Sequence, residues 1–317
     1  MHKKVVIFGG GTGLSYLLRG LKDFPIDITA VITVSDNGKS TGILRKEFNI
    51  PAVGDIRKVI TSLSEIDEPI KELMSYRFST SSDLDGHAVG NLILTAMLEI
   101  TGSLKDSIKS LSKLLDVKHT VLPISEDPEL TLVAEYEDKT IIEGEAEITK
   151  AHKKISKIYY KEEPKVVKEV LDAVKEADLI IFSMGSLYTS VLPNVICKDV
   201  LKSINKSTAP IMYLCNIVTQ PGETDNFSVG DHVSLINTYL YKRKIDVVIA
   251  NNSKIKDSIA QKYSTTEQKS PVKIDYKNIE RIGVELIEDN LATIEDNVLR
   301  HNSLKLSSLI FSYLMRD

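Results

Sequence analysis

The segment VVIFGGGTGLSYLLRGL, residues 5–21, decides the fold that we expect for this chain. Its first four residues are apolar and mostly β-branched, which is typical of a strand buried on both faces of a parallel sheet. Four leucines then recur at helical spacing: Leu14, Leu17, Leu18 and Leu21. A second apolar run, 28–34, predicts another strand. Such a strand–loop–helix–strand unit winds right-handed and places its loop at the carboxyl edge of the sheet.

The rest of the chain continues to alternate between helical and strand patterns. It predicts helices at 55–64, 69–76, 88–100, 104–115, 164–177, 231–241, 255–261 and 298–315. It predicts strands at 118–124, 130–136, 140–145, 179–182, 210–214 and 247–250. We therefore expect one Rossmann-like, doubly wound α/β domain over residues 1–317, with a mainly parallel sheet and a β-rich insertion at 118–160.

Composition excludes several classes of function. The 317 residues are 42% hydrophobic, which suits a large buried core, and the net charge of −4 argues against a nucleic-acid partner. No apolar run approaches the roughly 18 residues of a membrane span. The first apolar segment is too short for a signal peptide. Cys197 and Cys215 lie in apolar runs and are interpreted as reduced core residues. We expect a cytoplasmic protein.

The stretch SDNGKST, residues 35–41, ends like a nucleotide-binding P-loop but lacks its first glycine. The required position is Thr33, which lies inside the predicted second strand. The better candidate for phosphate contact is the turn formed by Gly9, Gly10, Gly11, Thr12 and Gly13. Glycines allow close backbone approach, and the following helix presents free N–H groups. A tight turn without a ligand is the alternative.

A dinucleotide site is a weaker alternative. The spacing G-x-G-x-x-G fails from Gly9 and from Gly11, although Asp36 lies at a suitable distance for a ribose contact. In the loop after the second strand, Asp36 and Lys39 are candidate ligand residues, and a solvated turn is the other interpretation.

Further polar clusters fall at predicted strand ends or helix starts. Asp55 could cap a helix, or bind a metal ion or a ligand hydroxyl, and Asn91 lies one turn after His87. Two later loops contribute more candidates: Gly185, Ser186 and Tyr188 in one, and Asn216 and Thr219 in the other. Parallel strands bring their carboxyl ends to one edge, so these loops are expected to converge on a ligand that carries phosphate and sugar.

The strings GGGTGLSYLLRGL, AVGDIRKVI, GHAVGNLIL, GSLYTSVLPN, NIVTQPGET and LRHN occur in this order along the chain. With them the sequence resembles the gluconeogenesis factor family, whose relatives include 2-phospho-L-lactate transferase. The resemblance implies a cytoplasmic bacterial protein that binds UDP-sugars, UDP-N-acetylglucosamine in particular. It also implies a requirement for cell shape and cell-wall growth on gluconeogenic carbon sources.

The resemblance adds two site residues that the pattern alone does not select. Tyr263 matches a tyrosine that precedes the family's Pro-Val strand, and Arg300 matches the arginine of its Arg-His motif. Tyr263 could stack on uracil, and Arg300 could engage the diphosphate or ring oxygens. The alternatives are a surface aromatic and an ion-paired arginine.

The sequence departs from the family at Asn37, where a second aspartate is usual, and at Met184, where a proline is usual. Loss of the aspartate pair weakens a Mg²⁺ site. We therefore expect no catalytic residues and no required cofactor, and a ligand-binding regulator with cell-wall or signalling protein partners. The sequence leaves open whether the chain forms homo-oligomers. The alternative is a transferase of phosphorus-containing groups, with Asp36 and Asp55 on a metal and His87 as base.

Overall fold

A computed structural model describes residues 2–295 and 298–316 of the chain. Within these residues, one parallel sheet has the strand order β10-β9-β8-β7-β1-β2-β3. Its strands are β1 (Lys3–Gly9), β2 (Ile26–Ile32), β3 (Thr120–Pro123), β7 (Leu179–Phe182), β8 (Ile211–Leu214), β9 (Val247–Asn251) and β10 (Glu285–Asp289). The expected doubly wound α/β fold is therefore confirmed.

The chain changes direction across the sheet between β1 and β7. It first moves outward from β1 to β2 and β3, and it later returns beside β1 as β7 and continues to β10. β1 pairs in parallel with both β2 and β7. Loops that follow two adjacent strands at such a switch point diverge to opposite faces, which leaves a crevice at the carboxyl edge.

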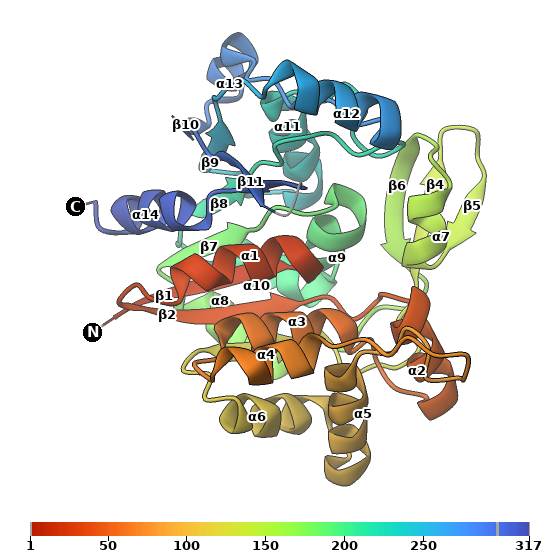
Figure 1. Ribbon diagram of the computed structural model, residues 1–317. Coiled ribbons are helices and arrows are strands. Elements are labelled where there is room, and N and C mark those ends of the chain that lie inside the picture. The colour runs from red at the N-terminus through yellow and green to blue at the C-terminus, as the bar shows by residue number, and fades with distance from the viewer. Residues whose placement is uncertain (1, 296–297, 317) are drawn as a thin grey trace.

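Helices cover both faces of the sheet (Figure 1). On one face, α1 (Gly11–Leu21) packs between α3 (Gly54–Leu63) and α14 (Ser303–Leu314). On the other face lie α8 (Lys168–Glu176), α9 (Leu192–Val195), α10 (Lys198–Lys206) and α11 (Val229–Leu240). The remaining α-helices are α2 (Lys39–Phe48), α4 (Glu68–Ser75), α5 (Val89–Thr101), α6 (Leu104–Leu114), α7 (Glu145–Lys150), α12 (Asp257–Glu267) and α13 (Tyr276–Ile282).

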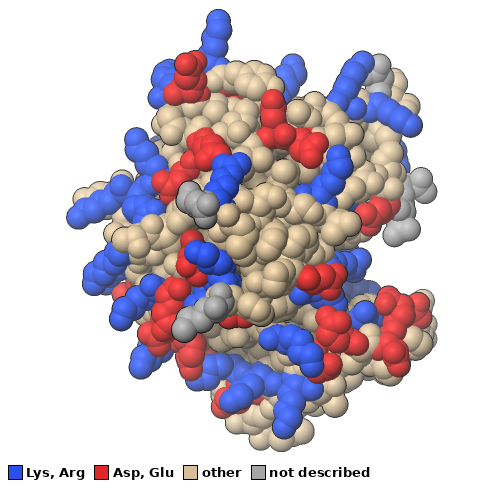
Figure 2. Space-filling model, turned by 90° about the vertical axis from the view of Figure 1, so that its left-hand side faces the viewer, with Lys and Arg blue, Asp and Glu red and all other residues tan. Residues whose placement is uncertain are grey.

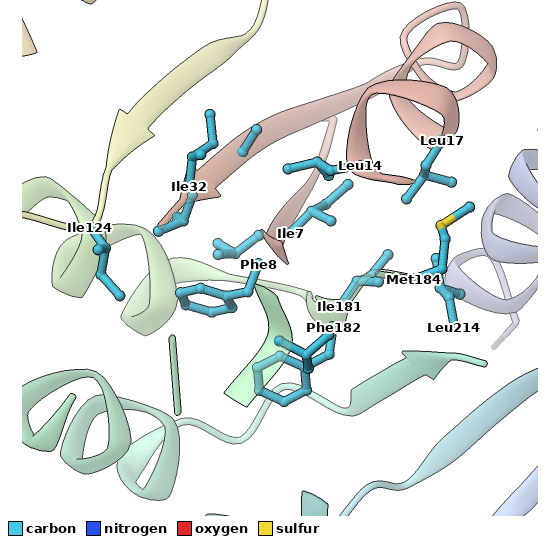
Figure 3. Packing of buried hydrophobic residues seen from close by; sticks show 14 of the residues in the cluster. Ile7, Phe8, Leu14, Leu17, Ile32, Ile124, Ile181, Phe182, Met184 and Leu214 are labelled. Atoms are coloured by element: carbon cyan, nitrogen blue, oxygen red, sulfur yellow. The ribbon is translucent and has the colours of Figure 1, made fainter. Parts of the chain in front are cut away.

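The core forms where strand side chains alternate between the two helical layers. Ile7 lies beside Leu14 of α1, whereas Phe8 and Phe182 lie together on the opposite side of the sheet (Figure 3). The two phenyl rings have centroids 5.7 Å apart. All four of these side chains are fully buried, as expected for the apolar run that opens the sequence. Cys197 and Cys215 are buried and free, so their prediction as core thiols is confirmed.

A small antiparallel sheet lies beyond the carboxyl edge, at the right in Figure 1. It consists of β4 (Leu132–Tyr136), β5 (Ile141–Glu143) and β6 (Ile155–Tyr160), with α7 between β5 and β6. The expected hairpin of β4 and β5 is confirmed. However, the small sheet starts later than residue 118, because β3 instead pairs with β2 and buries Val121 and Leu122 at the edge of the large sheet.

Arg45 of α2 and Asn37 in the loop after β2 hold this small sheet in place. The Arg45 guanidinium donates to the carbonyls of Ser35 and Asp36 on one side, and of Pro128 and Leu130 on the other, at 2.8–3.2 Å. Asn37, where the family usually has aspartate, accepts the amide proton of Ala146 at 2.9 Å. The loop expected after the second strand, in the stretch 35–41, is also shorter than expected, because α2 begins at Lys39.

The C-terminal region differs from the single helix predicted at 298–315. Residues Val298–His301 form β12, which pairs antiparallel with β11 (Ala292–Glu295). Helix α14 begins only at Ser303, because the Asn302 side chain accepts the Lys305 amide and caps it. The hairpin of β11 and β12 therefore places Arg300 over the carboxyl edge instead of on a helix.

The surface charge is mixed. On the face shown in Figure 2, acidic and basic side chains are interspersed, with no broad region of a single sign. No helix among residues 2–295 and 298–316 is long and apolar enough to cross a membrane.

Candidate functional site

The turn between β1 and α1 is built for close backbone approach. Helix α1 begins at Gly11, which has a φ of 53°, in the left-handed region that favours glycine. A β-carbon at Gly13 would lie 2.3 Å from the carbonyl oxygen of Met184, so the two loops at the switch point touch only because residue 13 is glycine. Thr12 lies exposed in the first turn of α1, whereas Gly10 is the N-cap.

A cavity of about 250 Å³ opens where these loops meet. We call it the central cavity. It combines groups from α1, from the loops after β7 and β8, from α12 and from β12. Among the residues proposed from sequence, the following line it: Thr12, Gly13, Gly185, Ser186, Asn216, Tyr263 and Arg300. The structure thus brings together segments that are almost 300 residues apart in the chain.

Two side chains hold the β7 and β8 loops in register. The Asn216 amide accepts the Gly185 N–H at 3.0 Å and donates to the Gly185 carbonyl at 2.7 Å. Ser186 donates to the buried Glu223 carboxylate at 2.5 Å, and its oxygen caps the Thr189 amide. Burial raises the pKa of Glu223. These contacts fix the cavity floor, so the backbone of Gly185 and Ser186 is set before any ligand enters.

The hairpin strand β12 forms the opposite wall. The Tyr263 hydroxyl accepts the Leu299 amide at 2.7 Å, which ties α12 to β12. His301 donates to the Cys215 carbonyl at the end of β8, and burial lowers the pKa of its imidazole to about 4. Between these anchors, the Arg300 guanidinium lies 4.9 Å from the centroid of the Tyr16 ring. The wall therefore presents a cation stacked on an aromatic ring of α1.

Gln220 supplies an unused acceptor in the same cavity. Its side-chain oxygen is buried and accepts no hydrogen bond from the described residues. A buried acceptor without a partner is costly in a folded protein, and a ligand N–H or O–H would satisfy it.

Other predicted residues gather in a neighbouring space of about 290 Å³, which we call the side hollow. Asp36, Lys39 and Asn91 line it together with Lys58 and Arg77. Asn91 is buried and accepts from Arg57 at 3.3 Å. Lys58 pairs with Asp55 at 2.8 Å, and the Asp55 carboxylate lies against Gly10 and Gly11. The hollow thus adjoins the turn between β1 and α1.

Three carboxylates in this region, those of Asp36, Asp55 and Glu145, interact electrostatically. Burial raises the pKa of Asp36, and the negative charge of Asp55 raises it further. The hydrogen bond from the Gly38 amide lowers this pKa, but by less than burial raises it. Burial and the same two aspartates raise the pKa of Glu145 well above its usual range. Even so, no group of three or more His, Cys, Asp or Glu side chains in the described chain has the geometry to hold a metal ion. A divalent cation here would need phosphate oxygens to complete its ligands.

The remaining predicted residues lie behind the cavity linings. Gly9 packs against Ser183, where a β-carbon would meet the serine oxygen at 2.2 Å. Tyr188 is buried, and this burial raises the pKa of its hydroxyl. The Thr219 hydroxyl accepts the Ser270 amide at 2.9 Å. These residues, like Gly10 and Gly11, shape the loops that carry the linings.

Sequence reasoning did not select Tyr16, Gln220, Lys58 or Arg77, although all four line a cavity. Tyr16 had one available signal: it is the aromatic residue one turn after Thr12 on α1, and so points to the same side. The positions of Gln220 and Arg77 depend on loop conformations, which the spacing of hydrophobic residues in the sequence does not predict.

Together, the sheet order and the central cavity define a doubly wound α/β protein with a preformed cavity at its topological switch point. The sequence model of 2-phospho-L-lactate transferase CofD matches residues 5–292. The chain belongs to this family.

Two gluconeogenesis factors match this chain over nearly their whole length. It is 43% identical over 309 residues to the gluconeogenesis factor of Halalkalibacterium halodurans, covering 97% of this chain and 95% of that protein. It is 41% identical over 312 residues to the gluconeogenesis factor of Bacillus subtilis, covering 98% of each. A crystal structure of a Bacillus halodurans protein matches with a TM-score of 0.95 and 43% identity, over 98% of this chain and 100% of the other.

Proposed function

We propose that this protein binds a UDP-sugar, UDP-N-acetylglucosamine in particular, in the central cavity and acts as a cytoplasmic regulator of cell-wall growth. The observation that carries the proposal is the position of the cavity. It lies at the switch point between β1 and β7, where Thr12 and Gly13 in the first turn of α1 line the cavity. A diphosphate is the ligand group that such a helix N-terminus and glycine turn favour.

The cavity walls suit the two ends of a nucleotide-sugar. Arg300 offers a forked donor set to phosphate oxygens, and its contact with Tyr16 limits its freedom. The Tyr263 ring lines the same wall and is proposed to stack on uracil, while the unpaired Gln220 oxygen could accept the uracil N–H. An aromatic face with one matched acceptor would favour a pyrimidine base.

A regulatory role is supported by the relatives named gluconeogenesis factor. We extend it to a role in cell shape on gluconeogenic carbon, exerted through cell-wall or signalling protein partners. A transferase is the second candidate. It is favoured by the electrostatic coupling of Asp36, Asp55 and Glu145, of which Asp55 lies against the turn between β1 and α1.

Calorimetry tests the binding proposal. UDP-N-acetylglucosamine should bind, UDP should bind more weakly, and NAD should not bind. Arg300→Ala should weaken the affinity at least about tenfold, because it removes a charge-assisted hydrogen bond. Arg281→Ala, at an exposed arginine of α13 whose partner is Asn278, is the matched control and should bind as wild type does. Tighter binding of NAD than of any UDP compound would refute the assignment.

Chromatography separates the regulator from the transferase. After long incubation of the protein with UDP-N-acetylglucosamine and Mg²⁺, the regulator leaves the nucleotide intact. Release of UMP that Asp55→Asn abolishes would support the transferase instead, because transfer of the sugar phosphate to water or another acceptor breaks the diphosphate and leaves UMP.

A further inference from the structure

A third space, larger than the central cavity, lies between α1, α3 and α4. Its volume is about 520 Å³, and we call it the basic groove. Thr12 and Tyr16 line both the central cavity and this groove, so the two spaces adjoin across these residues. Lys58 likewise lines both the groove and the side hollow. The groove is therefore next to the proposed nucleotide site, and it has different walls.

The charges of the groove are unbalanced. Its described lining contains two acidic side chains, Glu68 and Glu72, and a larger set of basic ones: Arg19, Lys22, Arg57, Lys58 and Lys71. All three lysines have carboxylate partners. Lys22 pairs with Glu65 at 2.8 Å, Lys58 with Asp55 at 2.8 Å, and Lys71 with Glu68 at 3.5 Å.

Arg57 is the exception that points to a ligand. It is only 5% exposed, yet it forms no ion pair with a carboxylate in the described part of the chain. Its hydrogen bonds are long and neutral, to Asn91 at 3.3 Å and to Ser75 at 3.4 Å, and neither uses Nη2. Burial and the nearby Arg77 lower the pKa of Arg57 to about 10, against the weaker attraction of the Asp55 carboxylate, so Arg57 stays charged at neutral pH. A buried cation without a direct ion-pair partner is costly, and the nearby Asp55 carboxylate is already paired with Lys58. An anionic ligand in the groove would supply the missing partner.

We propose that the basic groove is a second ligand site, which binds a small phosphorylated molecule with its phosphate on the Arg57 guanidinium and on Lys58. The planar fork of an arginine matches two phosphate oxygens, and a lysine adds a point charge. The exposed Thr12 hydroxyl at the shared wall is available to the rest of the ligand. The volume is in the range of small-molecule sites. This inference does not rest on the identity of the ligand in the central cavity.

Thermal unfolding of the full chain provides the test, with inorganic phosphate and glucose 6-phosphate as probes and sodium chloride at equal ionic strength as the control. Both probes should raise the melting temperature of the wild type, because they bind only the folded state. Arg57→Gln should raise the melting temperature without ligand, since it removes an uncompensated buried charge, and should weaken the binding of both probes at least tenfold. Arg281→Gln on α13 is the matched control and should change neither.

Arg57→Lys is a second variant that keeps the charge and loses the fork. Arg57→Lys should fold and should bind the probes more weakly than wild type does. The proposal can therefore still be tested if Arg57→Gln does not fold. Unchanged probe affinity in either folded variant would show that Arg57 is only structural and would overturn the proposal.

Saturation with UDP-N-acetylglucosamine distinguishes the two possible sources of the phosphate. A separate phosphorylated ligand should still bind to the saturated protein. Loss of all probe binding would show instead that the probes occupy the place of the nucleotide diphosphate, and the second site would be refuted while the nucleotide proposal stood. If no nucleotide binds, that proposal fails, and the comparison of wild type with the Arg57 variants still decides the groove.

Discussion

Acidification should destabilise this protein through His301, the residue that anchors β12 to the end of β8. The imidazole is 9% exposed and donates to the Cys215 carbonyl at 3.0 Å, so its neutral form is held in the folded state. Its pKa is lowered from 6.5 to about 4. The unfolded chain therefore takes up a proton at a higher pH than the folded chain does, and stability is lost as the pH falls from 6.5 toward 4.

The size of the loss follows from the two pKa values. At a pH of about 5, the unfolded histidine is almost fully protonated and the folded one almost fully neutral, which lowers the free energy of unfolding by about 2 kcal/mol relative to neutral pH. The loss levels off at about 3 kcal/mol below the folded pKa, since one pKa unit corresponds to about 1.4 kcal/mol.

Urea unfolding of wild type, His301→Gln and His301→Leu at neutral pH and near pH 5 measures this effect. Glutamine keeps a donor for Cys215, whereas leucine leaves the carbonyl unpaired and should cost stability at both pH values. Both variants should lose about 2 kcal/mol less than wild type on acidification. The buried His232 titrates equally in all three proteins and cancels. Equal pH dependence in wild type and both variants would refute the assignment.

Two further predictions concern the loops around the sites. Gly13→Ala places a β-carbon 2.3 Å from the Met184 carbonyl oxygen. It should therefore lower the free energy of unfolding, measured in urea, by about 1–3 kcal/mol. Unchanged stability would show that the two loops can separate without strain. Arg45→Ala removes donors to four backbone carbonyls and should expose the small sheet to limited proteolysis between β3 and β6 before the large sheet is cut. Cleavage at the same rate as in wild type would contradict its role as a clamp.

Local patterns predicted the parts of the fold that depend on nearest neighbours in the chain. The apolar run before the glycines became β1, and the leucines at helical spacing became the buried face of α1. The prediction failed where pairing between distant segments decides the outcome. The segment 118–124 joined the large sheet at the edge of β2, and 298–301 became a strand because residues 292–295 pair with it.

The candidate site shows the same division. Glycines, hydroxyls and amides after the strands marked the carboxyl edge, because parallel strands must end together. Tyr263 and Arg300 came from a family resemblance, and their contacts with β12 and Tyr16 appear only in the folded chain. The unpaired charge of Arg57 is equally invisible in sequence, since burial and partners are properties of packing.

The amino-acid sequence by itself determined the doubly wound fold and the glycine turn of this protein, because hydrophobic periodicity and backbone freedom act over a few neighbouring residues. Only the tertiary structure decided which polar side chains share a cavity and which charges lack a partner. Those properties arise when β1 and β7 meet at the switch point and the C-terminal hairpin folds over them, which brings together groups from opposite ends of the chain.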